Sequence, residues 1–291
     1  MIKDFKYFAP KTVEEALTLL TKYKENCKII AGGQSMLILM KQGLIAPKYL
    51  IDIKGITTLD YVNYDKNEGL RIGSLTTHRT IETSPTIRNG FSVLAEMERN
   101  LASVETRNWG TIGGNLCHAD PAGDPAPVLI ALEGKLKMVG PNGERTMAVE
   151  DFFKDYFETA LQADEILTEI QVPNPPPRTG TVYRKFSLLE GDYALVSAAV
   201  SITLGSKDDT CSDARIVLGA AAPVPMRAER AEKVLIGKEL KDTLLQEAGK
   251  AASEEARPIA DMHASEEYRR ELVGVLVKRV AGEAWERAKR A

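Results

Sequence analysis

One short stretch, from Trp109 to Asp124, constrains what this chain can fold into more than any other. It contains four glycines, and the residues between them are mostly small or polar. Because glycine has no Cβ, several main-chain N–H groups of such a stretch can approach one anion. We therefore expect a binding loop at this point of the chain.

A second glycine stretch, Ala31–Ser35, follows the apolar pair Ile29-Ile30 near the N-terminus. The helix predicted over 36–42 would point its N-terminus back at this stretch, and helix N-termini favour phosphate. A single Gly-Gly pair usually marks only a tight turn. Two such loops, each bordered by hydroxyl or amide side chains, could hold one diphosphate from two sides.

Neither loop carries a standard nucleotide-binding pattern. The chain lacks G-x-G-x-x-G, which argues against a Rossmann NAD site, and it lacks G-x-x-x-x-G-K-[ST], which argues against a P-loop. The sequence therefore predicts a dinucleotide site of another kind, with FAD as the favoured ligand.

Composition argues against several other classes. The net charge is −3 and there is no basic stripe, which argues against a nucleic-acid partner. No apolar run approaches the ~20 residues needed to cross a bilayer, and the start, MIKDFKYFAP, lacks the apolar core of a signal peptide. The three scattered cysteines fit a reducing compartment and lack the spacing of an iron–sulfur or zinc site. We expect a cytoplasmic protein with no metal site of its own.

The order of the predicted elements indicates an α+β chain. A βαβ-like unit comes first, short strands and helices follow, and a C-terminal part has strands and then helices. The predicted helices are 12–24, 36–42, 91–101, 127–132, 229–236, 241–255 and 266–288. The predicted strands are 27–30, 50–53, 59–63, 70–74, 135–139, 145–148, 166–172, 182–188, 196–204 and 214–218.

The proline-rich run over 173–177 stops regular structure and marks a boundary. We expect a first domain over 1–176, with subdomains of about 1–54 and 55–176, and a second domain over 177–291.

The glycine stretches also carry a resemblance to a known family. AGGQS at 31–35 and TIGGNLCHADPAGD at 111–124 resemble the two FAD motifs of the flavin subunit of molybdenum hydroxylases, the family of the carbon monoxide dehydrogenase and xanthine dehydrogenase type. The run from Arg184 to Ala194 is similar to its third segment, and Asp151–Phe153 lies in a stretch like the family's. The likeness covers essentially the whole chain.

The resemblance implies a vanillyl-alcohol-oxidase-type (PCMH-type) FAD-binding fold over 1–176, followed by a C-terminal domain with a three-stranded antiparallel sheet plus helices. It also implies that both glycine stretches line the pyrophosphate and ribityl chain of FAD. The residues implied there are Ala31, Gly32, Gly33, Gln34 and Ser35 on one side and Thr111, Gly113, Gly114 and Asn115 on the other.

Further cofactor contacts follow from the same resemblance. Asp124 would bind the adenosine ribose, or else cap a helix or turn. Lys185 would stand at the pyrimidine end of the flavin, where a cation stabilises the anionic reduced form, although most strand lysines are solvated. Tyr193 would lie near the isoalloxazine, and Leu167 would line the pocket; for both, core packing is the alternative.

Two weaker candidates complete the cofactor set. Thr77 would face the flavin, and Lys28 would contact phosphate. His118 and Cys117 invite a catalytic interpretation, but nothing in the sequence identifies a substrate or an orienting partner. We predict no catalytic residue on this chain.

The resemblance implies an electron-transfer flavoprotein subunit. Substrate would be oxidised at a molybdenum cofactor on a large subunit, and electrons would pass through [2Fe-2S] clusters of a small subunit to the FAD held here. The flavin would hand them to NAD, a quinone or oxygen. The subunits would assemble as a dimer of heterotrimers.

Two other functions stay open at this point. A stand-alone FAD-dependent oxidoreductase of the same fold would need its own substrate pocket, and no acid–base pair is evident. A flavin-free scaffold subunit would not need intact glycine loops. Copurification with iron–sulfur and molybdenum subunits would separate the electron-transfer subunit from the stand-alone oxidoreductase, and a flavin-free purified chain would favour the scaffold.

Overall fold

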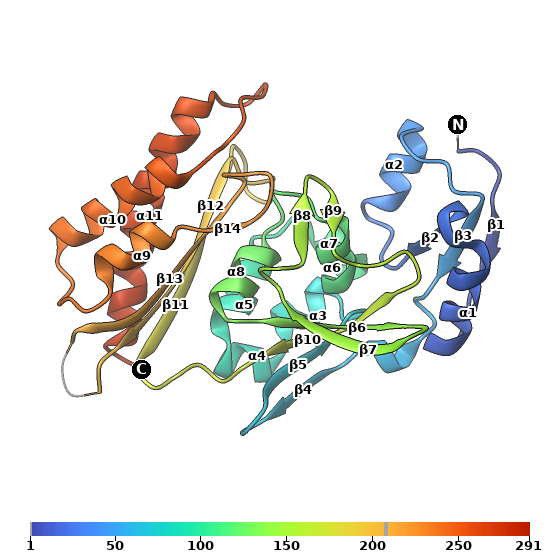
Figure 1. The fold of residues 1–291 in the computed structure, drawn as a ribbon, viewed down its shortest axis with the longest axis horizontal. Helices are drawn as coiled ribbons and strands as arrows, with labels where there is room; N and C mark the ends of the chain where they lie inside the picture. The colour runs from blue at the N-terminus through green and yellow to red at the C-terminus, as the bar shows by residue number, and fades with distance from the viewer. Residues whose placement is uncertain (1, 207–208) are drawn as a thin grey trace.

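The N-terminal part of the chain is a small parallel sheet with helices beside it (Figure 1). The computed structural model describes residues 2–206 and 209–291. Strand order is β1-β3-β2, and helix α1 begins where the Thr12 hydroxyl accepts a hydrogen bond from the Glu15 N–H at 3.2 Å. The elements are β1 (Lys6–Phe8), α1 (Val13–Tyr23), the 3-10 turn η1 (Lys24–Asn26), β2 (Cys27–Ile30), α2 (Met36–Gln42), β3 (Tyr49–Asp52) and the 3-10 turn η2 (Thr57–Leu59). The βαβ-like unit is confirmed, and β1 was not predicted.

The middle part is built on a five-stranded antiparallel sheet of order β4-β5-β10-β6-β7. Six short helices between β5 and β6 pack against it, as Figure 1 shows. The strands are β4 (Val62–Asp65), β5 (Gly69–Gly73), β6 (Lys135–Gly140), β7 (Gly143–Ala148) and β10 (Ile166–Val172), with a small separate pair β8 (Phe153–Asp155) and β9 (Glu158–Thr159). The helices are α3 (His78–Thr83), α4 (Pro85–Gly90), α5 (Ser92–Arg99), α6 (Val104–Trp109), α7 (Ile112–His118) and α8 (Pro125–Ala131).

Two predictions in this part were wrong. The strand expected over 59–63 starts only at Val62, because residues 57–59 form a 3-10 turn whose last residue, Leu59, is buried. Half of the loop expected over 109–124 is helical: Trp109 ends α6, and α7 runs from Ile112 to His118. Thr111 caps α7, and Ile112 and Leu116 are buried, so apolar spacing and a cap override the glycines.

The C-terminal part is an antiparallel sheet of order β11-β12-β13-β14 with three helices on one face. Three strands were predicted, and the fourth, β14, is only two residues long, too short to give a periodic signal. The strands are β11 (Thr179–Phe186), β12 (Val196–Leu204), β13 (Cys211–Gly219) and β14 (Met226–Arg227). The helices are α9 (Glu229–Leu235), α10 (Asp242–Glu255) and α11 (Glu266–Ala288), and the predicted bounds of α11 are confirmed.

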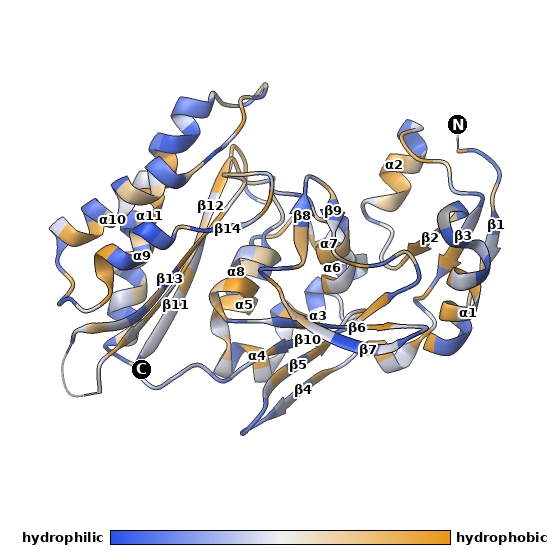
Figure 2. Cartoon of the chain, viewed as in Figure 1, coloured by the Kyte–Doolittle hydropathy of each residue, from blue (hydrophilic) through white to orange (hydrophobic). Residues whose placement is uncertain are grey.

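The C-terminal sheet is covered on both faces. On one side Val182, Ala198 and Ile216 join a core with α9, α10 and α11. On the other side the alternate residues Tyr183 and Ala199 join the core of the middle part. All seven residues of α8 are buried, and Figure 2 shows this helix as strongly hydrophobic beside the sheet. Side chains alternate between the two faces of a strand, so the C-terminal sheet contributes to both cores. It thereby joins the middle part of the chain to the C-terminal part.

Within residues 2–206 and 209–291, no helix has both the length and the apolar character needed to span a bilayer.

The close contact between β11 and α11 gives a test of this packing. A Cβ on Gly180 would lie 2.1 Å from the Ala284 carbonyl oxygen, whereas a Cβ on Gly282 would meet only Leu245 Cδ1 at 3.5 Å. We expect Gly180→Ala to lower the free energy of unfolding by about 2 kcal/mol, since α11 must move. Gly282→Ala is expected to raise it by about 0.8 kcal/mol, because alanine favours the helix. Urea unfolding followed by circular dichroism measures both, and equal effects would refute this account.

Candidate functional site

The two glycine stretches lie against each other, main chain to main chain. A Cβ on Gly32 would stand 2.1 Å from the Trp109 carbonyl oxygen and 2.8 Å from Gly110 Cα. On the other side of the contact, a Cβ on Gly114 would lie 3.9 Å from Ala31 Cβ. The structure therefore brings together the two segments that the sequence singled out.

The first stretch is an open loop between β2 and α2. Gly33 adopts a left-handed conformation with φ +74°, and its carbonyl accepts the Leu37 N–H that starts the helix. Among the described residues, the N–H groups of Gly32, Gly33, Gln34 and Ser35 find no acceptor. Four unpaired donors at a loop before a helix suit an anionic oxygen group.

Most N–H groups of the second stretch already have acceptors within the protein. The N–H groups of Ile112 and Gly113 donate to the carbonyls of Thr76 (3.1 Å) and Ser74 (3.0 Å), and that of Gly114 donates to Thr111 Oγ1 (3.1 Å). The expectation that both stretches offer free N–H groups was therefore wrong for this one. Its glycines instead let neighbouring segments approach closely, since a Cβ on Gly113 would lie 2.6 Å from Ser74.

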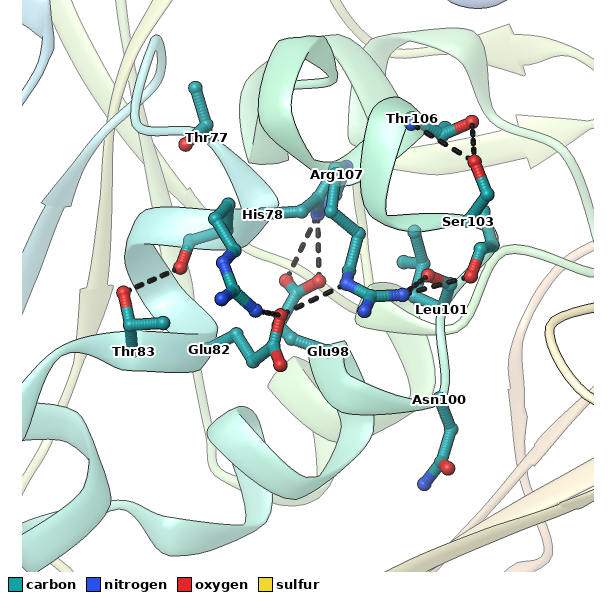
Figure 3. Close-up of polar contacts among 12 residues, drawn as sticks. Thr77, His78, Glu82, Thr83, Glu98, Asn100, Leu101, Ser103, Thr106 and Arg107 are labelled. Atoms are coloured by element: carbon teal, nitrogen blue, oxygen red, sulfur yellow. Dashed lines mark hydrogen bonds and ion pairs between the residues drawn. The ribbon is translucent and has the colours of Figure 1, made fainter.

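A buried pair, His78 and Glu98, lies next to the second stretch (Figure 3). The His78 N–H donates to the Gly110 carbonyl at 3.0 Å, and His78 Nδ1 lies 2.8 Å and 3.0 Å from the two carboxylate oxygens of Glu98. Burial raises the pKa of the Glu98 carboxyl, and the neighbouring His78 offsets part of that rise. The pair links α3 to α5, and the main chain of His78 binds Gly110, just before α7 begins.

A second buried pair holds α6. Arg107 Nε donates to Glu82 at 2.9 Å, and its Nη1 donates to the carbonyls of Leu101 and Ala102 at 2.7 Å and 2.8 Å (Figure 3). Sequence reasoning missed these groups. Glu98 had a signal that could have found it, because it lies on the apolar face of the predicted helix 91–101, between Leu94 and Leu101.

Asp124 forms a third buried cluster with the C-terminal sheet. Its side chain is 4% exposed, Lys185 Nζ lies 2.6 Å from one carboxylate oxygen, and the Tyr183 hydroxyl donates to the other at 2.6 Å. Burial raises the pKa of Asp124, and Lys185 and Tyr183 counteract it. Tyr183 and Lys185 share one face of β11, which is why both reach Asp124.

Two predicted cofactor residues thus contact each other. Asp124 was predicted at the adenosine ribose and Lys185 at the pyrimidine end of the flavin, and both roles stay predictions. Asp124 stands at the N-cap position of α8, but its side chain makes no cap hydrogen bond there.

The remaining predicted residues are spread over the molecule. Thr77 lies beside the second stretch, where it bridges Thr111, but its hydroxyl caps α3 by accepting the Thr80 N–H at 3.1 Å. Asn115 is half-buried on α7, and its side-chain oxygen would lie 3.2 Å from a Cβ on Gly123. Both therefore adjoin the glycine contact.

The glycine contact does not include the other three predicted residues, Lys28, Leu167 and Tyr193. Lys28 is exposed on β2, and Leu167 is buried in the core on β10. Tyr193 is 65% exposed and lines a separate cavity described below. Leu167 lies in the core, and its contact with the FAD pocket stays a prediction.

In the part of the chain that the structure describes, neither Cys117 nor His118 makes a side-chain hydrogen bond to an activating group. Burial raises the pKa of the Cys117 thiol to about 12, so the thiol is protonated at neutral pH. Burial lowers the pKa of His118, whose ring centroid lies 5.3 Å from that of Phe157. In the described part of the chain, no three His, Cys, Asp or Glu side chains gather as a metal site.

The residues present fit the diphosphate of a dinucleotide such as FAD. The open N–H groups of Gly32–Ser35 would hold the phosphate oxygens, and the glycine contact would keep side chains out of the way. A bound flavin supplies one- and two-electron transfer, and the protein positions and tunes it.

Comparison with known proteins agrees with this geometry. Residues 3–175 match the family described as "FAD binding domain in molybdopterin dehydrogenase", and residues 181–284 match "CO dehydrogenase flavoprotein C-terminal domain". The chain is 38% identical over 282 residues to the nicotine 6-hydroxylase medium subunit of Paenarthrobacter nicotinovorans, covering 96% of each chain. It is 34% identical over 283 residues to the carbon monoxide dehydrogenase medium chain of Hydrogenophaga pseudoflava, covering 97% of this chain and 98% of the relative.

The fold matches as well. The structure superimposes on a chain of carbon monoxide dehydrogenase from Hydrogenophaga pseudoflava with a TM-score of 0.95, at 35% identity over 99% of each chain. The protein is therefore a flavoprotein of the PCMH-type FAD-binding fold. It belongs to the molybdopterin dehydrogenase family, among the FAD-binding medium subunits of the carbon monoxide dehydrogenase type.

The contact of Gly32 with the Trp109 carbonyl predicts a specific loss of cofactor affinity. We expect Gly32→Ala to weaken FAD binding about tenfold or more, since a Cβ at 2.1 Å forces the two stretches apart. Titration of the apoprotein with FAD, read by flavin absorbance and by tryptophan fluorescence, gives the affinity. Gly90→Ala is the matched control, because a Cβ there meets nothing within 4 Å. Equal affinities for the two variants would contradict the assignment.

The His78–Glu98 pair predicts a stability difference along one helix. Glu98→Ala leaves His78 buried without its partner, and we expect it to lower the free energy of unfolding by about 3 kcal/mol. Glu98→Gln should cost less, because an amide oxygen still accepts from His78. Glu96→Ala on the same helix removes only a partly exposed ion pair with Arg287 and should cost under about 1 kcal/mol. Urea unfolding would refute the prediction if the two alanine variants were equally stable.

Proposed function

We propose that this chain transfers electrons, through FAD, within a molybdenum-containing hydroxylase or dehydrogenase complex. The observation that carries the proposal is the open N–H loop of Gly32–Ser35 pressed against the second glycine stretch, in a chain of this family. Its own residues bind and position the flavin. Substrate oxidation belongs to another subunit.

The complex proposed has two further kinds of subunit. A small subunit carries [2Fe-2S] clusters that deliver electrons to the flavin, and a large subunit carries the molybdenum cofactor. We propose a dimer of such heterotrimers, placed in the cytoplasm. In support, relatives are named as medium chains or subunits of larger enzymes, and the cysteines of this chain, at 27, 117 and 211, are too few and too scattered to hold the clusters.

The division of the chain is also a proposal. We place an FAD-binding domain over 1–176, with subdomains of about 1–54 and 55–176, and a C-terminal domain over 177–291. Matches of separate family models to 3–175 and 181–284 support this division. The glycine contact then lies between the two subdomains, and the Asp124–Lys185 pair lies between the two domains.

We propose a smaller set of FAD-binding residues than the sequence alone predicts. The Ala31–Ser35 loop would hold the diphosphate through its main chain, and Thr111–Asn115 would shape the opposite wall. The Asp124–Lys185 pair would act as one buried polar centre beside the cofactor rather than as two separate contacts.

The first test is the colour of the protein. The chain, purified and supplied with FAD, is expected to show absorption bands at about 450 nm and about 370 nm and to release FAD on heating, as a noncovalent flavoprotein does. Copurification with an iron–sulfur subunit and a molybdenum subunit is expected from the native source. A folded chain that takes up no FAD, alone or with those subunits, would overturn the proposal.

A further inference from the structure

The loop between β11 and β12, residues 187–194, carries Tyr193 on an exposed stretch of chain. The side chains of Leu188, Leu189 and Tyr193 are 58%, 70% and 65% exposed. Tyr193 lines a cavity of about 550 Å³, and Arg269 lines it too. Loops with few buried contacts open easily, so the place of Tyr193 depends on what holds this loop.

A buried arginine holds the base of the 187–194 loop. The Leu195 N–H donates to the Phe186 carbonyl at 2.8 Å, and the Leu195 carbonyl accepts from Arg269. Arg269 is 5% exposed, and it also donates to the Asp261 carboxylate at 2.5 Å. These contacts fix where the loop leaves the sheet, and its far side contacts another part of the molecule.

That far side rests on the turn between α5 and α6. Gly191 has a φ of +83°, and a Cβ there would lie 3.1 Å from the Ala102 carbonyl oxygen and 3.3 Å from its carbonyl carbon. The main chain of Gly191 therefore lies directly against Ala102. Tyr193 follows two positions later, so this contact bears on where its ring lies.

Ala102 has a conformation that needs support. Its φ of +46° lies in the left-handed region, which costs free energy for a residue with a Cβ. Arg107 Nη1 donates to the carbonyls of Leu101 and Ala102 at 2.7 Å and 2.8 Å, and its Nε donates to Glu82 at 2.9 Å (Figure 3). The Arg107 side chain is 8% exposed. One buried guanidinium thus holds the turn and is itself held by a carboxylate.

The two contacts meet at one atom, the Ala102 carbonyl oxygen. It accepts the hydrogen bond from Arg107, and it is the atom that a Cβ on Gly191 would approach most closely. A displacement of the guanidinium would move this oxygen, and the loop that lies against it would move as well.

We propose that Arg107 is a positioning residue that, through Ala102, sets the place of the 187–194 loop. The loop in turn sets where the Tyr193 ring lies against the flavin. The inference rests on the proposed function and names a residue outside the predicted cofactor set, which acts through the main chain of the turn.

The first experiment measures hydrogen exchange over 187–195 in the full chain free of FAD. Within this stretch the Asp192 N–H donates to the Leu189 carbonyl at 3.2 Å, and the Leu195 N–H donates to the Phe186 carbonyl at 2.8 Å. Opening of the loop exposes both amides, so their exchange reports how firmly the loop is held.

Arg107→Lys keeps the charge but loses the planar fork that reaches Glu82 and the turn at once. We expect the loop amides to exchange about tenfold faster. Arg79→Ala is the matched control. Arg79 is 44% exposed and binds the same Glu82 at 2.9 Å, so its loss disturbs that carboxylate and leaves the bonds from Arg107 to the turn in place. Equal exchange of the loop in both variants would overturn the proposal.

Gly191→Ala tests the contact from the other side, and it decides the question if Arg107→Lys does not fold. The Leu101 N–H donates to the Glu98 carbonyl at 3.1 Å, and its exchange should rise about tenfold when a Cβ pushes against the turn. Gly237→Ala is the control, because Gly237 has a similar φ of +78° and its Cβ would meet no atom of the described chain within 4 Å. Unchanged exchange at Leu101 in Gly191→Ala would contradict the contact.

The second experiment uses the fluorescence of the FAD-loaded chain. A tyrosine ring stacked on a flavin quenches its fluorescence by electron transfer. Tyr193→Leu and Arg107→Lys should each raise the fluorescence about threefold, because both remove the stacked ring, and Arg79→Ala should leave it unchanged. FAD affinity, measured in parallel, should stay the same in Arg107→Lys.

A rise in Tyr193→Leu without a rise in Arg107→Lys would overturn the proposal, and so would the absence of a rise in both. A chain that takes up no FAD would refute the proposed function instead. The exchange result would still decide whether Arg107 holds the loop.

Discussion

The main-chain contact between Gly32 and the Trp109–Gly110 peptide is the constraint on which the rest of the site depends. No side chain fits between the two stretches, so their approach has to be set by the elements that carry them. The parallel sheet β1-β3-β2 holds the first stretch. Two buried polar pairs, His78–Glu98 and the ion pair Glu82–Arg107, hold the second. Buried ion pairs add little net stability because both partners lose water, but they fix one arrangement of the helices that carry them.

Much of the fold could be predicted because its signals are local. Helix α11 was predicted with its observed bounds, because a long run of apolar residues at helical spacing marks it. The loop before α2 and the central strand β10 were also placed correctly. The two-residue strand β14 and the three-residue strand β1 were missed because pairs of such length form only where a neighbouring strand is already in place.

The site itself was only partly predictable, because the hydrogen-bond partners of its residues come from distant segments of the chain. Residues 31–35 and 110–114 look alike in glycine content, yet among the described residues four consecutive N–H groups, those of residues 32–35, lack an acceptor in the first, whereas most N–H groups of the second are bonded. The carbonyls of Ser74 and Thr76, which take the donors of the second, come from a different segment. The pairing of Asp124 with Lys185 joins residues 61 positions apart, so no local pattern contains it. The glycine content therefore predicts where two main chains can approach each other. The acceptors that other segments supply decide which N–H groups remain available to a ligand.

The C-terminal sheet contributes alternate side chains to two cores, and this has a consequence for how such proteins can recombine. Tyr183 and Lys185 on β11 complete a polar centre whose acid, Asp124, lies before α8 in the preceding part of the chain. A chimera that joins the first 176 residues of one relative to the C-terminal part of another would inherit both halves of this centre from different parents. Compatibility at these three positions, rather than at the linker, therefore sets which family members can exchange their C-terminal parts.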